Sequence, residues 1–382
     1  MVHPTSQREA QIVLNNFINS DLINYKKFRS YDYGPQHRHN VSCLSPYITH
    51  RLLFEFKVIK QVLEEYPYES VHKFIDEIFW RIYWRGWLEQ KPTVWSDFVK
   101  NYNSLDFSDG YRQAVKGQTQ VACFNHWMLE LKSKNYLHNH ARMWFASIWI
   151  FTLRLPWEQG AALFLKYLLD GDSASNTLSW RWVGGLHTVG KHYLANKQNI
   201  EEFSNFKIED DALSTNAAAL TEEQLHEKRN SLLLKAHNGS GKVLIAFENE
   251  LNLENLTCKF KQYSEIKVLI LENSERQIKL SSSVLNFKKK LAHSLTESIS
   301  NITLISNRAF EKLILMRSDI DILYPGVGEN LDYLEALNKR HDINFSFLTR
   351  RQDTFCHRYS GKGYFSFKKK IPSILHDLEL AR

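Results

Sequence analysis

Two aspartates open a stretch in which several kinds of reactive side chain follow one another closely. The run DGDSASNTLSWRW places Asp170 and Asp172 after an apolar segment, and Asn176, Trp180 and Trp182 follow shortly. Indoles stack on flat heterocycles, and a carboxylate or an amide beside them can hydrogen-bond to the polar edge of such a ring. The stretch therefore contains the side chains that a site for a flat, polar molecule needs.

A second group of this kind lies in FIDEIFWRIYWRGW, residues 74–87. On a helix Glu77, Trp80, Arg81 and Trp84 fall three and four residues apart, so a carboxylate, a cation and two indoles share one stripe. One interpretation is an amphipathic helix with an exposed Glu–Arg pair. The other is a cavity wall on which bases or heterocycles stack.

A third group lies in YLHNHARMW, residues 136–144, where Asn139, Arg142 and Met143 share one face of a predicted helix. Arg142 could face the same cavity and pair with an aspartate. Taken alone, the segment fits an exposed basic helix face better.

The composition limits the classes of protein to which the chain can belong. The 382 residues include 43% apolar residues, and the net charge of +7 suggests affinity for polyanions without requiring it. Cys43, Cys123, Cys258 and Cys356 form no CxxC pair, so neither a disulfide framework nor a metal site is indicated. The N-terminal residues lack an apolar signal core, so we expect a cytoplasmic protein without a membrane span.

The chain divides into two parts of different character. All ten tryptophans lie between Trp80 and Trp182, and residues 1–208 show helical periodicity. Residues 209–241 are polar and predict a linker with one helix from Thr221 to Ala236. Residues 242–382 alternate helix-like stretches with strand-like runs, which predicts an α/β domain with a mostly parallel sheet. The predicted strands are KVLIAF, IKVLILE, NITLIS, KLILM and INFSFL.

The order and content of these motifs resemble the FAD-binding domain of the photolyase and cryptochrome family, over Tyr25 to about Phe203. The resemblance implies an all-α FAD-binding domain. VSCLSP, residues 41–46, resembles the family's phosphate-binding segment, EIFWRIYW its ELIWREFY-type helix, and YLHNHARM its WMHNRLRM-type segment. DGDSASNTLSWRW resembles the family's DGD motif. The flavin-binding residues that this implies are Tyr25, Ser42, Leu44, Ser45, Arg81, Arg142, Asp170, Asp172 and Asn176.

The resemblance also implies residues for the substrate and for electron transfer. The residues expected at a pyrimidine dimer are Glu77, Trp80, Asn139, Met143 and Trp182. Asn139 and Met143 stand where (6-4) photolyases have two histidines, which favours cyclobutane dimers. Trp180 and Trp157 match the inner and middle members of the family's tryptophan chain. The outer position falls near Ser104, and Tyr102, Tyr111 or Trp95 are possible substitutes.

The α/β part comes second here, whereas ordinary photolyases place their antenna domain first. The late stretch GKGYFSFKK resembles the end of that antenna domain, so the chain is similar to a circularly permuted, short photolyase-like subfamily. The implied activity is FAD-dependent, blue-light-driven repair of cyclobutane dimers in DNA by a monomeric protein. A second, antenna chromophore of unknown identity is possible. The alternatives are a cryptochrome-like photoreceptor without repair activity, a flavin-binding protein without light chemistry and, for residues 242–382, an unrelated α/β module.

Overall fold

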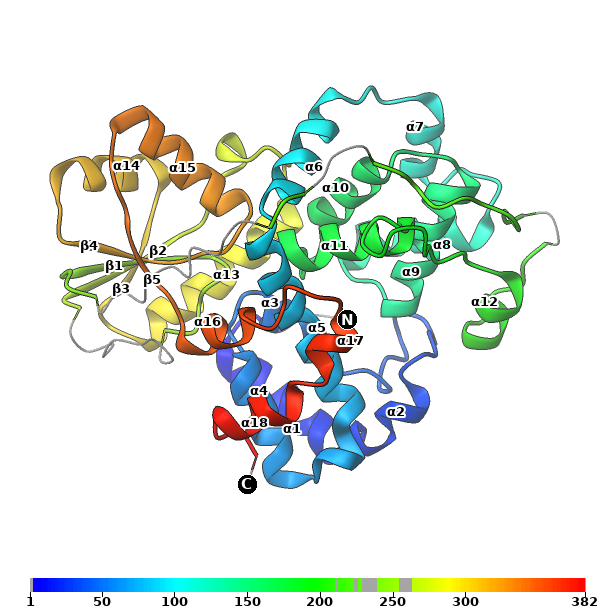
Figure 1. The fold of residues 1–382 in the computed structure, drawn as a ribbon, viewed down its shortest axis with the longest axis horizontal. Coiled ribbons are helices and arrows are strands. Elements are labelled where there is room, and N and C mark those ends of the chain that lie inside the picture. The colour runs from blue at the N-terminus through cyan, green and yellow to red at the C-terminus, as the bar shows by residue number, and fades with distance from the viewer. Residues whose placement is uncertain (1–2, 210–211, 223–225, 229–238, 254–262, 382) are drawn as a thin grey trace.

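Helices make up the first part of the chain. A computed structural model describes residues 3–209, 212–222, 226–228, 239–253 and 263–381. The helices in the first part are α1 (Gln7–Ser20), η1 (Leu22–Asn24), α2 (Tyr25–Phe28), α3 (Ser45–Thr49), α4 (Glu55–Glu65), α5 (Tyr68–Gln90), α6 (Thr93–Ser104), α7 (Asp109–Lys116), α8 (Ala122–Lys134), α9 (Asn139–Ser147), η2 (Ile148–Thr152), α10 (Trp157–Tyr167), α11 (Ser173–Gly184) and α12 (Lys197–Phe203). Figure 1 shows these helices at the centre and right, beside the sheet.

The limits of α11 follow from the local sequence. The side chain of Asp172 accepts hydrogen bonds from the backbone N–H groups of Ala174 and Ser175, both at 2.9 Å. These bonds satisfy donors that have no partner inside the helix, and the carboxylate suits the positive end of the helix dipole. The helix ends at Gly184, and the next residue, Gly185, has a φ of +84°, which favours glycine. One residue of the DGD motif therefore positions the helix that carries Asn176, Trp180 and Trp182.

A parallel sheet forms the second part. Its strands are β1 (Val243–Phe247), β2 (Glu265–Leu269), β3 (Ile302–Ile305), β4 (Ile320–Leu323) and β5 (Ser346–Leu348), in the order β3-β2-β1-β4-β5. All four pairings are parallel, with Val243 opposite both Glu265 and Ile320. The order reverses between β1 and β4, where the carboxyl ends of an open α/β sheet form a crevice. The predicted fold class, a helical part followed by an α/β parallel sheet, is confirmed.

One predicted strand is wrong, and one strand was not predicted. KLILM belongs to helix α14 (Asn307–Met316), which Ser306 caps and whose buried Phe310 and Ile314 lie four residues apart. Short apolar runs do not distinguish a strand from a buried helix face. Strand β4 was missed because Asp321 interrupts its apolar run. That carboxylate is buried and accepts hydrogen bonds from the Tyr263 hydroxyl and the Gly241 N–H.

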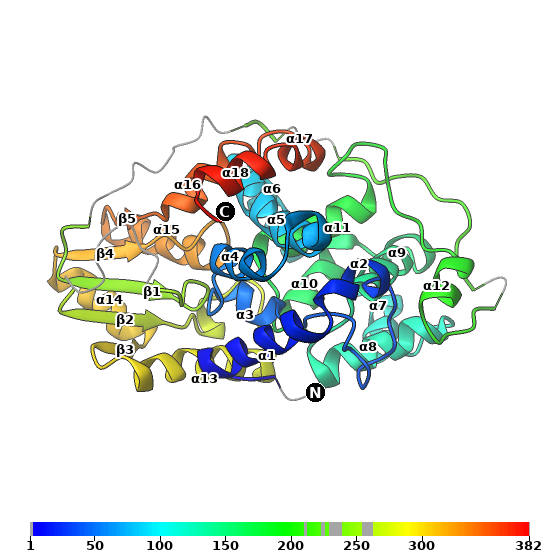
Figure 2. The ribbon, with the colours of Figure 1, turned by 90° about the horizontal axis from the view of Figure 1, so that it is seen from below.

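The two parts share one hydrophobic core. Helices α14 and α15 (Glu329–His341) cover one face of the sheet, where Phe310 and Leu334 pack on Ile245. On the other face, Leu244 and Val268 join the core that continues through α13 (Ser282–Ser298) into the first part. Figure 2 shows α13 beside β3 and α1. The relative position of the two parts is therefore fixed by apolar packing.

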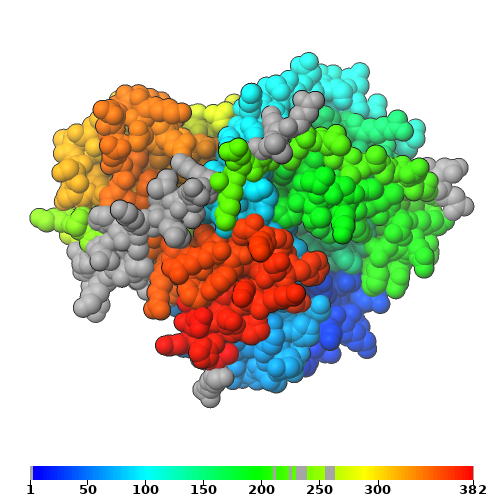
Figure 3. Space-filling model, in the orientation of Figure 1, coloured from blue at the N-terminus to red at the C-terminus, as the bar shows by residue number. Residues whose placement is uncertain are grey.

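The last helices return to the first part of the chain. These are α16 (Arg351–His357), α17 (Tyr364–Lys368) and α18 (Ile371–Asp377). Phe367 packs against Phe79 of α5 at 6.1 Å between ring centroids, and the three helices form part of the surface seen in Figure 3. The predicted boundaries at residues 208 and 242 stay predictions. The predicted helix Thr221–Ala236 falls largely outside the described residues. Within the described part of the chain, no helix is long and apolar enough to cross a membrane.

Candidate functional site

Asp170 lies at the centre of the motifs that the sequence analysis singled out. Its Oδ2 atom accepts a hydrogen bond at 2.8 Å from the Arg142 guanidinium of α9 and another from the hydroxyl of Ser45, the first residue of α3. Arg142 is held further by a bond from its Nε to the Leu137 carbonyl. Asp170 is 7% exposed, and its Oδ1 atom has no hydrogen-bond partner within the part of the chain that the structure describes. Three motifs that are far apart in sequence therefore meet at one carboxylate.

Asp172 links α11 to α5. Besides capping α11, its Oδ2 accepts a hydrogen bond at 2.8 Å from Arg81. Burial alone would raise the pKa of Asp172, but the positive charge of Arg81 and the hydrogen bonds from Ser175 outweigh it, so the pKa lies below its usual value. Asp172 is therefore ionised, and it fixes Arg81 within the site.

The inner side chains of α11 are buried. Asn176 donates a hydrogen bond to the Ala161 carbonyl of α10 at 2.9 Å. Trp180 is 2% exposed, packs against Phe164 and Phe145, and has an Nε1 atom without a partner. These residues form a buried wall of α11, and their contact with a flavin stays a prediction.

Glu77 and Trp80 lie on the same helix as Arg81 but have other partners. The Glu77 carboxylate is bound by Arg29, which also lies over the ring of Tyr25. Burial raises the pKa of Glu77, and the charge of Arg29 opposes that rise. The ring of Trp80 stacks face to face on Tyr364 of α17, with ring centroids 3.4 Å apart. Glu77 and Trp80 both remain partly exposed.

The remaining predicted residues are more scattered. Asn139 is exposed at the start of α9, and Met143 is half-buried one turn later. Trp182 stacks on Tyr193 with centroids 5.8 Å apart. Among the described residues no ring contact joins Trp80 with Trp182, so the pocket predicted between them stays a prediction. The Ser42 hydroxyl accepts a weak hydrogen bond from the N–H of Leu44, which is fully buried.

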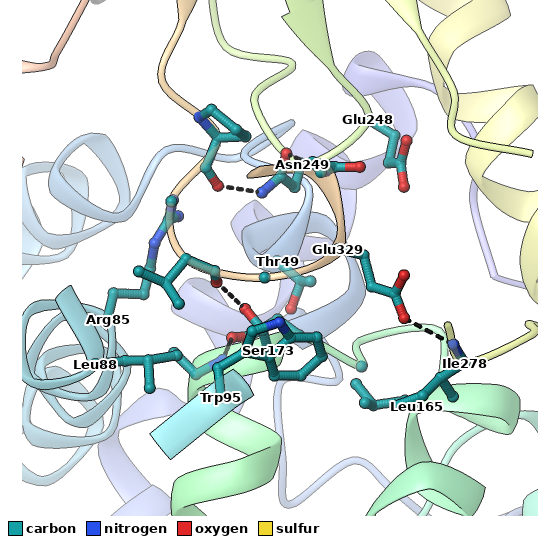
Figure 4. A pocket seen from close by; sticks show the side chains of 18 of the residues that line it. Thr49, Arg85, Leu88, Trp95, Leu165, Ser173, Glu248, Asn249, Ile278 and Glu329 are labelled. Carbon is teal, nitrogen blue, oxygen red and sulfur yellow. Dashed lines mark hydrogen bonds between the residues drawn. The ribbon is translucent and has the colours of Figure 1, made fainter. Parts of the chain in front are cut away.

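A cleft that no sequence motif indicated lies between the sheet and the helical part. It is lined by residues that follow β1 and β4, among them Glu248 and Asn249, and by Arg85, Glu89 and Lys288 (Figure 4). The Glu89 carboxylate of α5 accepts hydrogen bonds from the Val327 N–H at 3.0 Å and the Tyr324 hydroxyl at 2.8 Å. The sequence could have indicated this cleft, because its residues directly follow strands whose carboxyl ends lie at one edge of the sheet. Strand β4 was not predicted, so only the residues after β1 could have been recognised in this way.

The residues around Asp170 and Asp172 fit FAD. Asp170 Oδ1 and Trp180 Nε1 are buried polar atoms that find no hydrogen-bond partner among the described residues, and such atoms normally have one. The donor set also suits the molecule. Hydroxyls of Ser42 and Ser45 can bind a pyrophosphate, while the guanidinium of Arg142 and the amide of Asn176 suit the polar edges of a flavin ring.

Comparison with known proteins agrees with this assignment. Residues 74–209 match the family model for the FAD binding domain of DNA photolyase. The chain is similar to the deoxyribodipyrimidine photo-lyase of Buchnera aphidicola, with 26% identity over 167 residues, covering 40% of this chain and 34% of that protein. It is similar to the Streptomyces griseus photo-lyase with 34% identity over 117 residues, covering 30% of this chain and 26% of that protein.

Among solved structures, a class III photolyase from Agrobacterium tumefaciens aligns with a TM-score of 0.45 and 24% identity, over 52% of this chain and 42% of that one. The matched segments span 26% to 36% of the length of the first three relatives. The helical fold and the site define a flavin-binding domain. Residues 74–209 are similar to the FAD-binding domain of the photolyase/cryptochrome family, and the cofactor that this similarity indicates is FAD.

Proposed function

We propose that this protein repairs cyclobutane pyrimidine dimers in DNA by light-driven electron transfer from reduced FAD. The observation that carries this proposal is the arrangement along α5. Arg81 is tied to Asp172 on the flavin side, while Glu77 and Trp80, within the preceding turn, are partly exposed. One rigid helix thus connects the flavin site to groups that suit a damaged base pair.

Bound FAD supplies the electron when it is reduced and absorbs blue light. Arg142 and Asp170 orient the ring system, and Asp172 keeps Arg81 in place. A dimer flipped out of the helix would stack on the indoles of Trp80 and Trp182, with Asn139 and Met143 at its edge. A dimer carbonyl that displaces Arg29 removes the charge that opposes the rise in the pKa of Glu77 caused by burial. The Glu77 carboxyl then takes up a proton and donates a hydrogen bond to the carbonyl.

The second candidate is a blue-light photoreceptor without repair activity. The observation that favours it is the stack of Tyr364 on Trp80, because one face of this indole is already covered by the protein. Tyr364 is held there by a hydrogen bond from its hydroxyl to the Asp76 carbonyl at 2.9 Å. A dimer would have to use the other face or the edge of Trp80.

The two candidates differ in a direct repair assay. Purified protein loaded with FAD and chemically reduced is illuminated with an oligonucleotide that contains a thymine dimer, and restored thymines are counted. We expect repair by the wild type. A protein that retains FAD and leaves every dimer intact would contradict the repair proposal and leave the photoreceptor.

Glu77→Gln tests the role of the carboxyl in that assay. The dimer carbonyl gains negative charge when it accepts the electron, and a hydrogen bond to a charged partner contributes about 1.5–3 kcal/mol. The amide of Gln is a weaker donor than the Glu77 carboxyl, so we expect repair to slow by roughly 10-fold while FAD is retained. Glu69→Gln, at an exposed position on the same helix, is the matched control and should repair normally. Equal rates for the two variants would show that Glu77 does not contact the dimer.

A further inference from the structure

Trp149 is a buried indole that the site described above does not use. It is fully buried, in η2, the π-helical turn that follows α9. Its ring centroid lies 6.4 Å from that of Trp180, at an interplanar angle of 88°. A π-helical turn contains one residue more than an α-helical turn and so changes the direction of the side chains, and such turns are frequent at functional sites.

A glycine allows the two indoles to approach one another. A Cβ atom at Gly160 of α10 would lie 2.3 Å from Cη2 of Trp180 and 3.0 Å from Nε1 of Trp149. Any side chain at position 160 would therefore force the rings apart. Close packing of these two indoles depends on this glycine.

From Trp149 the aromatic contacts continue toward the surface. The ring of Tyr111, on α7, lies 5.8 Å from that of Trp149. Tyr111 is half-buried, and its next neighbour, Phe107 at 4.8 Å, is 45% exposed. Two steps between neighbouring oxidisable rings thus connect Trp180 with a phenol near solvent.

The branch through Trp157 is less favourable for a positive charge. Trp157 stacks on Phe98 at 5.4 Å, and a phenyl ring resists oxidation. The guanidinium of Arg181 lies 5.9 Å from the Trp157 ring centre, so its charge, partly offset by Glu222, opposes a cation on that indole. In contrast, Nε1 of Trp149 donates a hydrogen bond at 2.8 Å to the Pro156 carbonyl, whose oxygen stabilises positive charge on the indole.

We propose that Trp149 and Tyr111 carry the electrons that reduce the cofactor in light. Trp180 gives one electron to the excited isoalloxazine, Trp149 returns one to the oxidised Trp180, and Tyr111 returns one to Trp149. Tyr111 loses its phenolic proton to water as it is oxidised. A thiol in solution restores the electron and the proton. This inference rests on the light chemistry of the proposed function.

The route is tested by single substitutions in the protein loaded with oxidised FAD. The rate of flavin bleaching under blue light is measured with a thiol present. We expect Trp149→Phe to slow bleaching at least about tenfold, the effect of about 1.4 kcal/mol on a barrier. Trp157→Phe should slow it less. Tyr66→Phe, at the end of α4, removes a half-buried phenol without a role in the route and is the control, with a rate like the wild type.

A second measurement identifies the radical directly. Electron paramagnetic resonance after illumination should show a tyrosyl signal in the wild type, and Tyr111→Phe should remove it. FAD released on denaturation and the circular dichroism spectrum check that each variant is folded and loaded. A variant Trp149→Phe that bleaches normally, or a wild type that holds FAD without bleaching, overturns the route. In either case repair by chemically reduced protein would leave the proposed function intact.

Discussion

At the scale of single residues, the site depends on buried ion pairs. The carboxylate of Asp170 accepts hydrogen bonds from Arg142 and Ser45, and its backbone carbonyl accepts one from the hydroxyl of Thr49. Removal of one partner from a buried ion pair is costly because the other charge remains without compensation. The aspartate therefore supports the local fold and, with it, the proposed flavin site.

Asp170→Asn tests this pairing. The neutral amide leaves the Arg142 charge unpaired, so we expect the free energy of unfolding to fall by roughly 3 kcal/mol and FAD to be lost on purification. Urea unfolding and the flavin-to-protein absorbance ratio measure the two effects. Asp109→Asn, in the exposed pair with Arg112, should change stability by less than about 1 kcal/mol. Similar losses for both variants would contradict the special position of Asp170.

The residue types of the site were predictable from the sequence, but their partners were not. The pairing of Arg142 with Asp170 was expected and is present. The partner of Glu77, Arg29, and the partner of Trp80, Tyr364, were not foreseen. Tyr364 lies almost three hundred residues after Trp80 in the chain, and no local pattern reports such a contact. Only the packing of the C-terminal helices on α5 brings the two rings together.

At the scale of elements, the packing of α10 on α11 depends on Gly160. Glycine ordinarily weakens a helix interior by about 1 kcal/mol relative to alanine. The adjacent Trp180 ring reverses that preference, since an added Cβ would lie 2.3 Å from it. Overpacking of this kind typically costs about 1–3 kcal/mol.

Gly160→Ala is therefore expected to lower the free energy of unfolding by about 1–3 kcal/mol, although alanine favours helix. Gly110→Ala in α7 is the matched control. There the nearest side-chain atom would be 3.6 Å away, which is ordinary contact, and we expect stabilisation of up to about 1 kcal/mol. Denaturant unfolding gives both values. Stabilisation by Gly160→Ala would show that Trp180 moves aside without cost.

Elements with a clear helical periodicity of apolar residues were predicted correctly. Elements whose secondary structure depends on capping residues or on distant hydrogen-bond partners were not. The stripe of Glu77, Trp80 and Arg81 lies on α5 as expected. KLILM became a helix because Ser306 caps it and because only one side of it faces the sheet. Strand β4 carries a buried carboxylate whose hydrogen bonds come from Tyr263 and Gly241, far from it in sequence. The sequence of the strand alone does not show that these distant groups allow its carboxylate to be buried.

At the scale of the whole molecule, titratable groups lie where the two parts meet. Asp332 of α15 accepts a hydrogen bond at 2.7 Å from the indole N–H of Trp95 in α6. Burial raises the pKa of Asp332 from 3.8 to about 7, the Trp95 hydrogen bond opposes the rise, and Glu329 and Glu335 add to it. The contact between the sheet and the helical part should therefore depend on pH.

The sign of that dependence follows from linkage. Between pH 3.8 and about 7 the unfolded chain releases the proton of Asp332 while the folded protein keeps it. The contribution of Asp332 to the free energy of unfolding is therefore fully present below pH 3.8 and is lost as the pH rises through about 7. The full shift corresponds to at most about 4 kcal/mol, and we expect about 2 kcal/mol because the side chain is partly exposed to screening solvent.

Asp332→Asn keeps an oxygen that can accept the Trp95 hydrogen bond and removes the ionisation. Urea unfolding gives the free energy of unfolding of both proteins at pH 4 and at pH 8. We expect the difference, variant minus wild type, to be about 2 kcal/mol larger at pH 8 than at pH 4. Trp95→Phe keeps the carboxyl and removes the donor that lowers its pKa. In that variant the loss of stability should extend to higher pH. Parallel curves for all three proteins would show that Asp332 ionises in the folded protein as it does in the unfolded chain.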